Sequence, residues 1–132
     1  MHLNEERTIR NTIESVLSNQ GFLVKRDFEL SKGLFVDMVA FSGGKALLIE
    51  IKNSRFPLDQ SDLMQVASYA NIMKSMRDFS DKEILSCVVA PKGTISSATP
   101  YADDLKIHVI KSLNEQKIAE ELEVCIGARS LH

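Results

Sequence analysis

Two acidic residues and a lysine interrupt the most apolar part of this chain, and together they could support metal and phosphate chemistry. Asp37 lies in one apolar run, and Glu50 and Lys52 end the next one. The runs are joined through Gly43 and Gly44, a pair that readily supplies the positive φ angles of a two-residue hairpin turn. Counting outward from such a turn sets Asp37 opposite Glu50, with their Cβ atoms roughly 5 Å apart.

Two carboxylates side by side in apolar surroundings need a compensating partner. Like charges directly opposite on a sheet destabilise it, and burying both without a partner is costly. Either one carboxyl stays protonated, as in coupled acid pairs, or a divalent cation binds between them. Lys52 leaves the same face of its strand as Glu50, because residues two apart on a strand share a face. The pattern therefore indicates a cation site with an ammonium group beside it, a combination suited to binding phosphate.

The elements that must position these residues alternate between helices and strands. The apolar spacing predicts helices at 4–20, 60–77, 100–105 and 112–124, and strands at 22–30, 34–41, 46–51, 84–90 and 106–110. The strands at 34–41 and 46–51 are apolar on both faces, which is typical of central strands covered on two sides. The sequence thus predicts an α/β layered domain with a mixed sheet, in the order helix, three strands, helix, strand, helix, strand, helix.

The composition indicates one globular domain over residues 1–132. The chain is 44% hydrophobic and 26% charged, which excludes a disordered or fibrous protein. No apolar run reaches the length of a membrane span and the N-terminus does not resemble a signal peptide. Two cysteines without metal-ligand spacing fit reduced core thiols, with a single disulfide as the alternative, so we expect a cytoplasmic protein without a membrane partner. A net charge of −2 argues against indiscriminate coating of nucleic acid, but not against an enzyme that binds one short piece of it.

An acid in one strand, a tight turn and Glu-x-Lys in the next strand resemble the PD-(D/E)XK nuclease superfamily, which includes restriction endonucleases, Holliday-junction resolvases and RecB-type exonucleases. The resemblance implies a restriction-endonuclease-like three-layer core and a metal-dependent nuclease, with DNA the favoured substrate. It implies that Asp37 and Glu50, with the carbonyl of Ile51, bind Mg²⁺ or Mn²⁺, and that Lys52 is the motif lysine. Val36 stands where the family motif has a proline.

A second motif in the long helix adds to the resemblance. Gln65 and Tyr69 match the Q-x-x-x-Y motif of RecB-type members, and positions four apart share one helix face. In that role they would steady Lys52 or the strand being cut. A structural interpretation stays open for each residue. Gln65 could reach back to the helix start in a near capping box with Asp62. Tyr69 could be a core residue whose hydroxyl lies at the edge of the core.

The first helix matches the family least. Members often place a glutamate there near the metal, or a histidine in RecB-type enzymes, whereas the corresponding spacing in this chain reaches Arg10. Glu6 lies one turn earlier and Glu14 one turn later. Glu6 is the favoured additional metal ligand, because that end of the helix could still reach the site.

Three functions stay open from the sequence. The first is phosphodiester hydrolysis by a metal-dependent nuclease, with an endonuclease favoured. The second is a non-catalytic nucleic-acid-binding or assembly module that keeps the fold, and the third is a structure-specific junction resolvase. A chain this small has little surface for a substrate unless it forms a homodimer or joins a larger complex.

Overall fold

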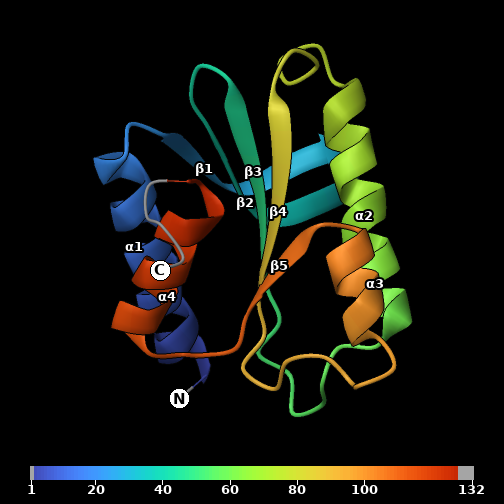
Figure 1. The fold of residues 1–132 in the computed structure, drawn as a ribbon. Coiled ribbons are helices and arrows are strands. Elements are labelled where there is room, and N and C mark those ends of the chain that lie inside the picture. The colour runs from blue at the N-terminus through green and yellow to red at the C-terminus, as the bar shows by residue number, and fades with distance from the viewer. Residues whose placement is uncertain (1, 128–132) are drawn as a thin grey trace.

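The helices and strands of the computed structural model follow the predicted order (Figure 1). The structure describes residues 2–127, with the side chains of residues 2–4 left aside. The elements are α1 (His2–Asn19), β1 (Leu23–Ser31), β2 (Leu34–Phe41), β3 (Lys45–Ile51), α2 (Gln60–Ser75), β4 (Glu83–Val89), α3 (Thr99–Asp104), β5 (Ile107–Ile110) and α4 (Glu115–Cys125). None of these described helices has the length and apolar character that crossing a membrane requires.

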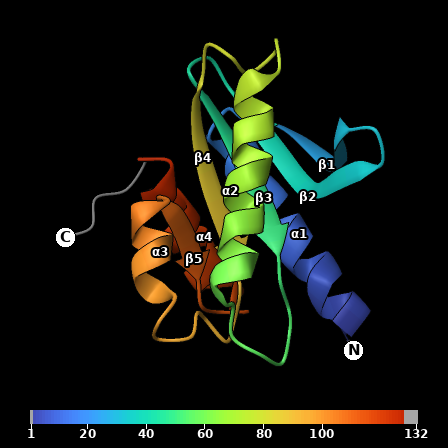
Figure 2. The same ribbon diagram turned by 90° about the vertical axis from the view of Figure 1, so that its right-hand side faces the viewer.

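One mixed sheet forms the middle layer of the fold. Its five strands lie in the order β1-β2-β3-β4-β5. The pairs β1–β2 and β2–β3 are antiparallel, whereas β3–β4 and β4–β5 are parallel. Helices α1 and α4 cover one face of the sheet, and α2 and α3 cover the other (Figures 1 and 2). The predicted α/β class with a mixed sheet between two helical layers is confirmed.

Each face of the sheet buries its own apolar core, because the central strands carry apolar side chains on both sides. Leu48 and Leu63 belong to the core between the sheet and α2, whereas Leu47 and Ile13 belong to the core between the sheet and α1. Burying such a side chain contributes about 1.5–3 kcal/mol. Strand β3, which ends beside Glu50, is therefore fixed from both faces.

The register of the β2–β3 hairpin is the one predicted from the glycine pair. Met38 pairs with Ile49, and Phe41 pairs with Ala46. Continuing this register brings Asp37 next to Glu50. Pairing register depends on the number of residues in the connection, which the sequence states directly.

The turn of this hairpin differs from the predicted one. Neither Gly43 nor Gly44 adopts a φ in the left-handed region. The ammonium group of Lys82 instead donates hydrogen bonds to the carbonyl oxygens of Ser42, at 3.0 Å, and Gly43, at 2.7 Å. A lysine from the loop before β4 thus holds the turn from outside, so the turn does not need the special backbone freedom of glycine.

Gly44→Ala is expected to keep or raise the free energy of unfolding, by up to about 1 kcal/mol, because alanine lowers the entropy of the unfolded chain. A Cβ atom at Gly44 would meet no other atom within 4 Å. Gly33→Ala is the matched control: it also has open space, but its φ of +79° should make alanine cost about 1 kcal/mol. Urea denaturation measures both, and equal losses would contradict this account of the turn.

Candidate active site

Strand β2 turns away from β3 at Asp37. The β2–β3 ladder ends with Met38 and Ile49, although both strands continue beyond that pair. Residues two apart on a regular strand share a face, yet Val36 packs in the core beneath α2 and Met38 in the core beneath α1. The strand therefore rotates at Asp37, and β1 and β2 lead away from the rest of the sheet (Figure 2).

Strand β1 rotates at the same level. Val24 packs in the core beneath α1, whereas Phe28 packs in the core beneath α2. Between them Asp27 adopts a φ of 48°, in the left-handed region that residues other than glycine rarely occupy. Such a conformation costs of order 1–3 kcal/mol and persists where the surrounding structure imposes it.

Two carboxylates accept the hydrogen bonds that the ladder no longer provides. The Asp37 N–H donates to Oε1 of Glu50 at 2.8 Å, and the Ile51 N–H donates to Oδ2 of Asp37 at 2.7 Å. The structure thus brings Asp37 and Glu50 together, although they are linked through the backbone and do not form a regular cross-strand pair. A carboxylate offers about four lone-pair sites, so each retains acceptor capacity.

Glu50 is a buried carboxylate, with a relative exposure of 7%. Burial raises the pKa of its carboxyl above the ordinary glutamate value, and the charge of Asp37 adds to the rise. The Asp37 N–H and the positive charges of Lys52 and Arg10 act in the opposite direction without cancelling the rise. These surroundings favour a bound proton or an added positive charge at Glu50.

Lys52 approaches Glu50 from the end of β3. Its Nζ lies 3.9 Å from Oε2 of Glu50 and donates a hydrogen bond to Oε1 of Gln65 at 3.4 Å. Helix α2 begins with a capping box formed by Asp59 and Asp62. Gln65 therefore does not cap the helix, so that interpretation is wrong, and its amide lies beside the lysine.

Two other predicted residues lie on the helices on either side of this cluster, Tyr69 on α2 and Glu6 on α1. Tyr69 packs, partly buried, against the core beneath α2, as its structural interpretation expects. Among the described side chains, those of residues 5–127, no three His, Cys, Asp or Glu side chains form a group that could hold a metal ion. Glu6 therefore does not complete a metal-binding set with Asp37 and Glu50, and its prediction as a ligand has no support from the geometry.

Arg10 occupies the position that faces Asp37 from α1. Its Nη2 donates to Oδ1 of Asp37 at 2.9 Å, and its Nη1 lies 3.5 Å from Oδ1 of Asp27. The spacing of the first helix pointed to Arg10, but the expectation of an acidic ligand led the prediction to Glu6. Asp27 had no sequence signal, because only the rotation of β1 brings it to this arginine.

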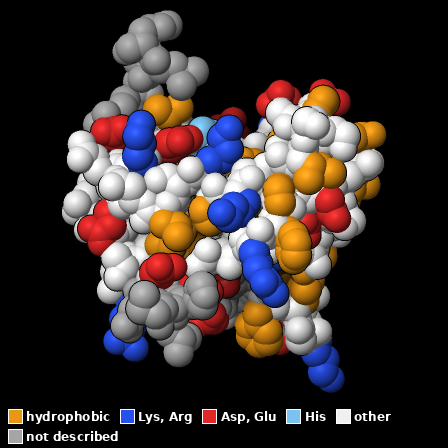
Figure 3. Space-filling view, turned by 90° about the horizontal axis from the view of Figure 1, so that it is seen from below, with side chains coloured by type: hydrophobic (Ala, Val, Ile, Leu, Met, Phe, Trp, Pro, Cys, Tyr) orange, Lys and Arg blue, Asp and Glu red, His pale blue; other side chains and the backbone are white. Residues whose placement is uncertain are grey.

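Basic and hydrophobic side chains lie side by side at the end of the molecule where β3 and β4 finish (Figure 3). The segments after these strands are joined by a hydrogen bond from the Leu58 N–H to the Gly93 carbonyl, at 2.8 Å. Phe56 is 70% exposed, and the Arg55 guanidinium lies 5.9 Å from the centre of its ring. Cationic and aromatic groups of this kind contact phosphates and bases in nucleic-acid complexes.

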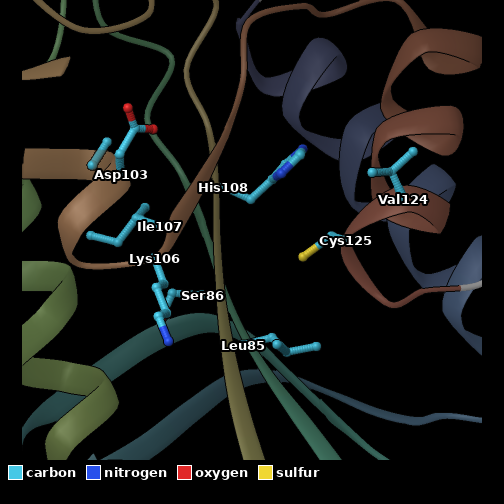
Figure 4. Close-up of a pocket in the computed structure, with 9 residues that line it drawn as sticks. Leu85, Ser86, Asp103, Lys106, Ile107, His108, Val124 and Cys125 are labelled. Carbon is cyan, nitrogen blue, oxygen red and sulfur yellow. The ribbon is translucent and has the colours of Figure 1, made fainter. Parts of the chain in front are cut away.

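A pocket of about 380 Å³ lies at β5, away from the carboxylates (Figure 4). Its lining residues come from β4, α3, β5 and α4 and the loop before β5: Leu85, Ser86, Ala102, Asp103, Lys106, Ile107, His108, Val124 and Cys125. None of these lining residues belongs to the carboxylate cluster. The ring of His108 is engaged by the Glu121 carboxylate at 2.9 Å, which fits a structural role.

Comparisons with known proteins concern the fold. No family model and no curated protein matches the chain. Its similar solved structures include the protein of unknown function AF1548, at a TM-score of 0.56 and 17% identity over 74% of this chain and 53% of that one. A repair endonuclease from Pyrococcus abyssi has a TM-score of 0.52 and 19% identity, over 67% of this chain and 37% of that one. EndoMS in complex with double-stranded DNA has a TM-score of 0.50 and 21% identity, over 67% of this chain and 34% of that one.

These structural neighbours share the layered α/β arrangement, and repair endonucleases are among them. The chain spans between 34% and 53% of the length of these three neighbours. The TM-scores support a common, nuclease-like fold, whereas identities this low carry no information about the chemistry of the site.

Glu50→Gln is expected to raise the free energy of unfolding of the metal-free protein by about 1 kcal/mol near neutral pH. The change removes a charge from a dry position and keeps an oxygen that can accept from the Asp37 N–H. Because the pKa of Glu50 is raised, its ionised form destabilises the fold at neutral pH, and this cost disappears once both states are protonated. Thermal denaturation with a chelator should show a gain in Tm that shrinks toward about pH 4.

Asp37→Asn is the matched comparison within the same cluster. It removes the ionised partner of Arg10, whose side chain is 19% exposed, so the free energy of unfolding should fall by about 1–3 kcal/mol. The two substitutions should therefore shift Tm in opposite directions. Shifts of the same sign would show that the burial of Glu50 is not the destabilising factor.

Proposed function

We propose that this chain is a metal-dependent nuclease of the PD-(D/E)XK type that hydrolyses phosphodiester bonds, with DNA as the favoured substrate. The observation that carries the proposal is the adjacency of Asp37 and Glu50 where β2 leaves β3, with Lys52 at 3.9 Å from Glu50. The fold likeness to repair endonucleases supports the reaction class, and the likeness to a protein in complex with double-stranded DNA supports the substrate class.

The donor set at this position suits Mg²⁺ or Mn²⁺. Asp37 and Glu50 keep unused lone pairs after their backbone hydrogen bonds, and carboxylate oxygens are the ligands that these hard cations prefer. Together with the carbonyl of Ile51, they would hold the ion. A bound ion of this kind polarises a phosphate and lowers the pKa of a coordinated water.

Lys52 would bring a positive charge to the scissile phosphate. An ammonium group has three N–H donors, and in this protein it faces the Glu50 carboxylate and the Gln65 amide. A donor is therefore left for a phosphate oxygen, while Glu50 and Gln65 fix the orientation of the amine. Donors fixed in advance where negative charge develops stabilise the transition state. Arg55, at the end of the molecule, would contact a flanking phosphate.

Lys52→Ala is expected to lower the rate of DNA cleavage with Mg²⁺ or Mn²⁺ by about 100-fold or more, the usual effect of removing one such donor. Its fold should be kept, with a modest fall in Tm, because the buried Glu50 carboxylate loses a positive neighbour at 3.9 Å. Lys32→Ala, in the exposed β1–β2 turn, is the control for loss of a positive charge. Equal cleavage by Lys52→Ala and the parent would reject the assignment.

The choice of substrates in the same assay separates the remaining alternatives. Plasmid DNA distinguishes cleavage within a chain from cleavage at an end, a four-way junction tests the resolvase alternative, and RNA tests the preference for DNA. Sedimentation with and without the junction measures whether the chain forms the homodimer that we predict as one way to enlarge its substrate surface.

One observation favours a second function, a non-catalytic nucleic-acid-binding module. Arg10 already supplies a positive charge at 2.9 Å from Asp37, and within the described residues no third His, Cys, Asp or Glu side chain completes a group that could hold a metal ion. A module of this kind would bind DNA equally with and without Mg²⁺ or Mn²⁺ and would cleave none of the substrates. Ion-independent binding without cleavage would replace the nuclease proposal with this one.

A further inference from the structure

Arg10 is held between two carboxylates. Its Nη2 lies 2.9 Å from Oδ1 of Asp37, and its Nη1 lies 3.5 Å from Oδ1 of Asp27. The side chains of Arg10 and Asp37 are only 19% and 25% exposed, so water screens their attraction less than it would at an open surface. The arginine therefore neutralises Asp37, one of the two carboxylates that the proposed function assigns to the metal ion.

A divalent cation and Arg10 compete for the same carboxylate. Both are positive, and like charges a few ångströms apart repel strongly where water is partly excluded. Metal binding at Asp37 must therefore proceed against the guanidinium or move it away. In either case Arg10 lowers the affinity of the unliganded protein for the metal ion.

The guanidinium of Arg10 can leave Asp37 on the side that faces Asp27. The Asp27 contact is the longer of the two, and the Asp27 side chain is 75% exposed. A guanidinium released from Asp37 therefore lies at the protein surface, beside the point where β2 leaves β3. There a phosphate group can accept two parallel N–H bonds from it, the arrangement that arginine forms best.

We propose that Arg10 is an internal counter-ion of Asp37 that couples metal binding to phosphate binding. A phosphate of the nucleic acid draws the guanidinium away from Asp37, and the freed carboxylate then binds the metal ion. This inference rests on the proposed function, because it takes Asp37 as a metal ligand. Coupling between two ligands is reciprocal, so metal and nucleic acid each strengthen the binding of the other by the same factor.

The first experiment is a calorimetric titration of Mn²⁺ into the parent and into Arg10→Gln, without nucleic acid. Glutamine removes the charge and keeps a polar group beside Asp37. Arg10→Gln should bind Mn²⁺ on the order of tenfold more tightly, within the range of roughly 5–150-fold that site–site couplings span. Arg10→Lys, which keeps the charge, should stay close to the parent and shows whether loss of charge or loss of shape is responsible.

Arg26→Gln is the matched control. Arg26 also joins β1 to α1, because its Nε donates to Oε1 of Glu14 at 2.7 Å and its Nη2 to Oδ1 of Asn11 at 2.7 Å. It carries the same charge on the same pair of elements, and neither of these partners belongs to the carboxylate cluster. Its Mn²⁺ affinity should equal that of the parent, which excludes net charge as the cause of the Arg10→Gln effect.

The second experiment repeats the Mn²⁺ titration with a saturating duplex oligonucleotide whose phosphorothioate linkages resist cleavage. In the parent, the oligonucleotide should tighten Mn²⁺ binding on the order of tenfold. In Arg10→Gln the carboxylate is already free, so the oligonucleotide should change the Mn²⁺ affinity much less. Circular dichroism and Tm of each variant confirm that the fold is kept.

Equal Mn²⁺ affinities of the parent and Arg10→Gln would overturn this inference and leave the proposed function standing, because the ion still binds. An Mn²⁺ affinity of the parent that does not respond to the oligonucleotide would overturn the coupling. Mn²⁺ binding by neither protein would also overturn it, and the cleavage assay with Lys52→Ala then decides the proposed function separately.

Discussion

The separation of β2 from β3 at Asp37 is the constraint on which the candidate site depends. Where two strands part, their N–H groups need new acceptors, because an unpaired backbone group away from water is costly. Glu50 accepts from the Asp37 N–H, and Asp37 accepts from the Ile51 N–H. The two carboxylates are therefore held by the strand ends themselves, which fixes their positions without any bound ligand.

Because helices cover both faces of β3, the carboxyl group of Glu50 lies in apolar surroundings. Apolar layers on both faces leave Glu50 little water, so its carboxyl is held in a position that disfavours its own charge. A protein selected for stability alone would place a neutral side chain there. The carboxyl group in this apolar position is the kind of local conflict that is expected at functional sites, where activity and stability oppose each other.

Arg10 changes the charge balance of the site relative to the family pattern that the motifs resemble. The position from which the first helix would contribute a negative ligand contributes a positive group instead. Asp37, Glu50 and the more exposed Asp27 then lie beside an arginine and a lysine, so much of the negative charge is already balanced before any ligand binds. Under the proposed coupling, such a cluster would bind an ion and a phosphate best when both arrive together, because either one alone leaves the charges unmatched.

The sequence by itself determined the order of the elements, the register of the β2–β3 hairpin and hence the proximity of Asp37 to Glu50. These features follow from periodicity along the chain and from the length of one connection, which are local properties. The detailed turn could not be predicted, because its carbonyls are held by Lys82 from a loop that is distant in sequence.

Only the tertiary structure decided which residues of the helices meet the carboxylates. Glu6 and Arg10 are four positions apart and share one helix face, and the sequence gives conflicting indications: the spacing reaches Arg10, whereas the preference for an acidic ligand favours Glu6. The placement of α1 against the sheet decides the choice, and it brings Arg10 to Asp37. In the same way, Gln65 could cap its helix or face the site, and the pairing of Asp59 with Asp62 left it beside Lys52. Contacts between layers depend on how the layers pack, and no local pattern in the chain encodes that packing.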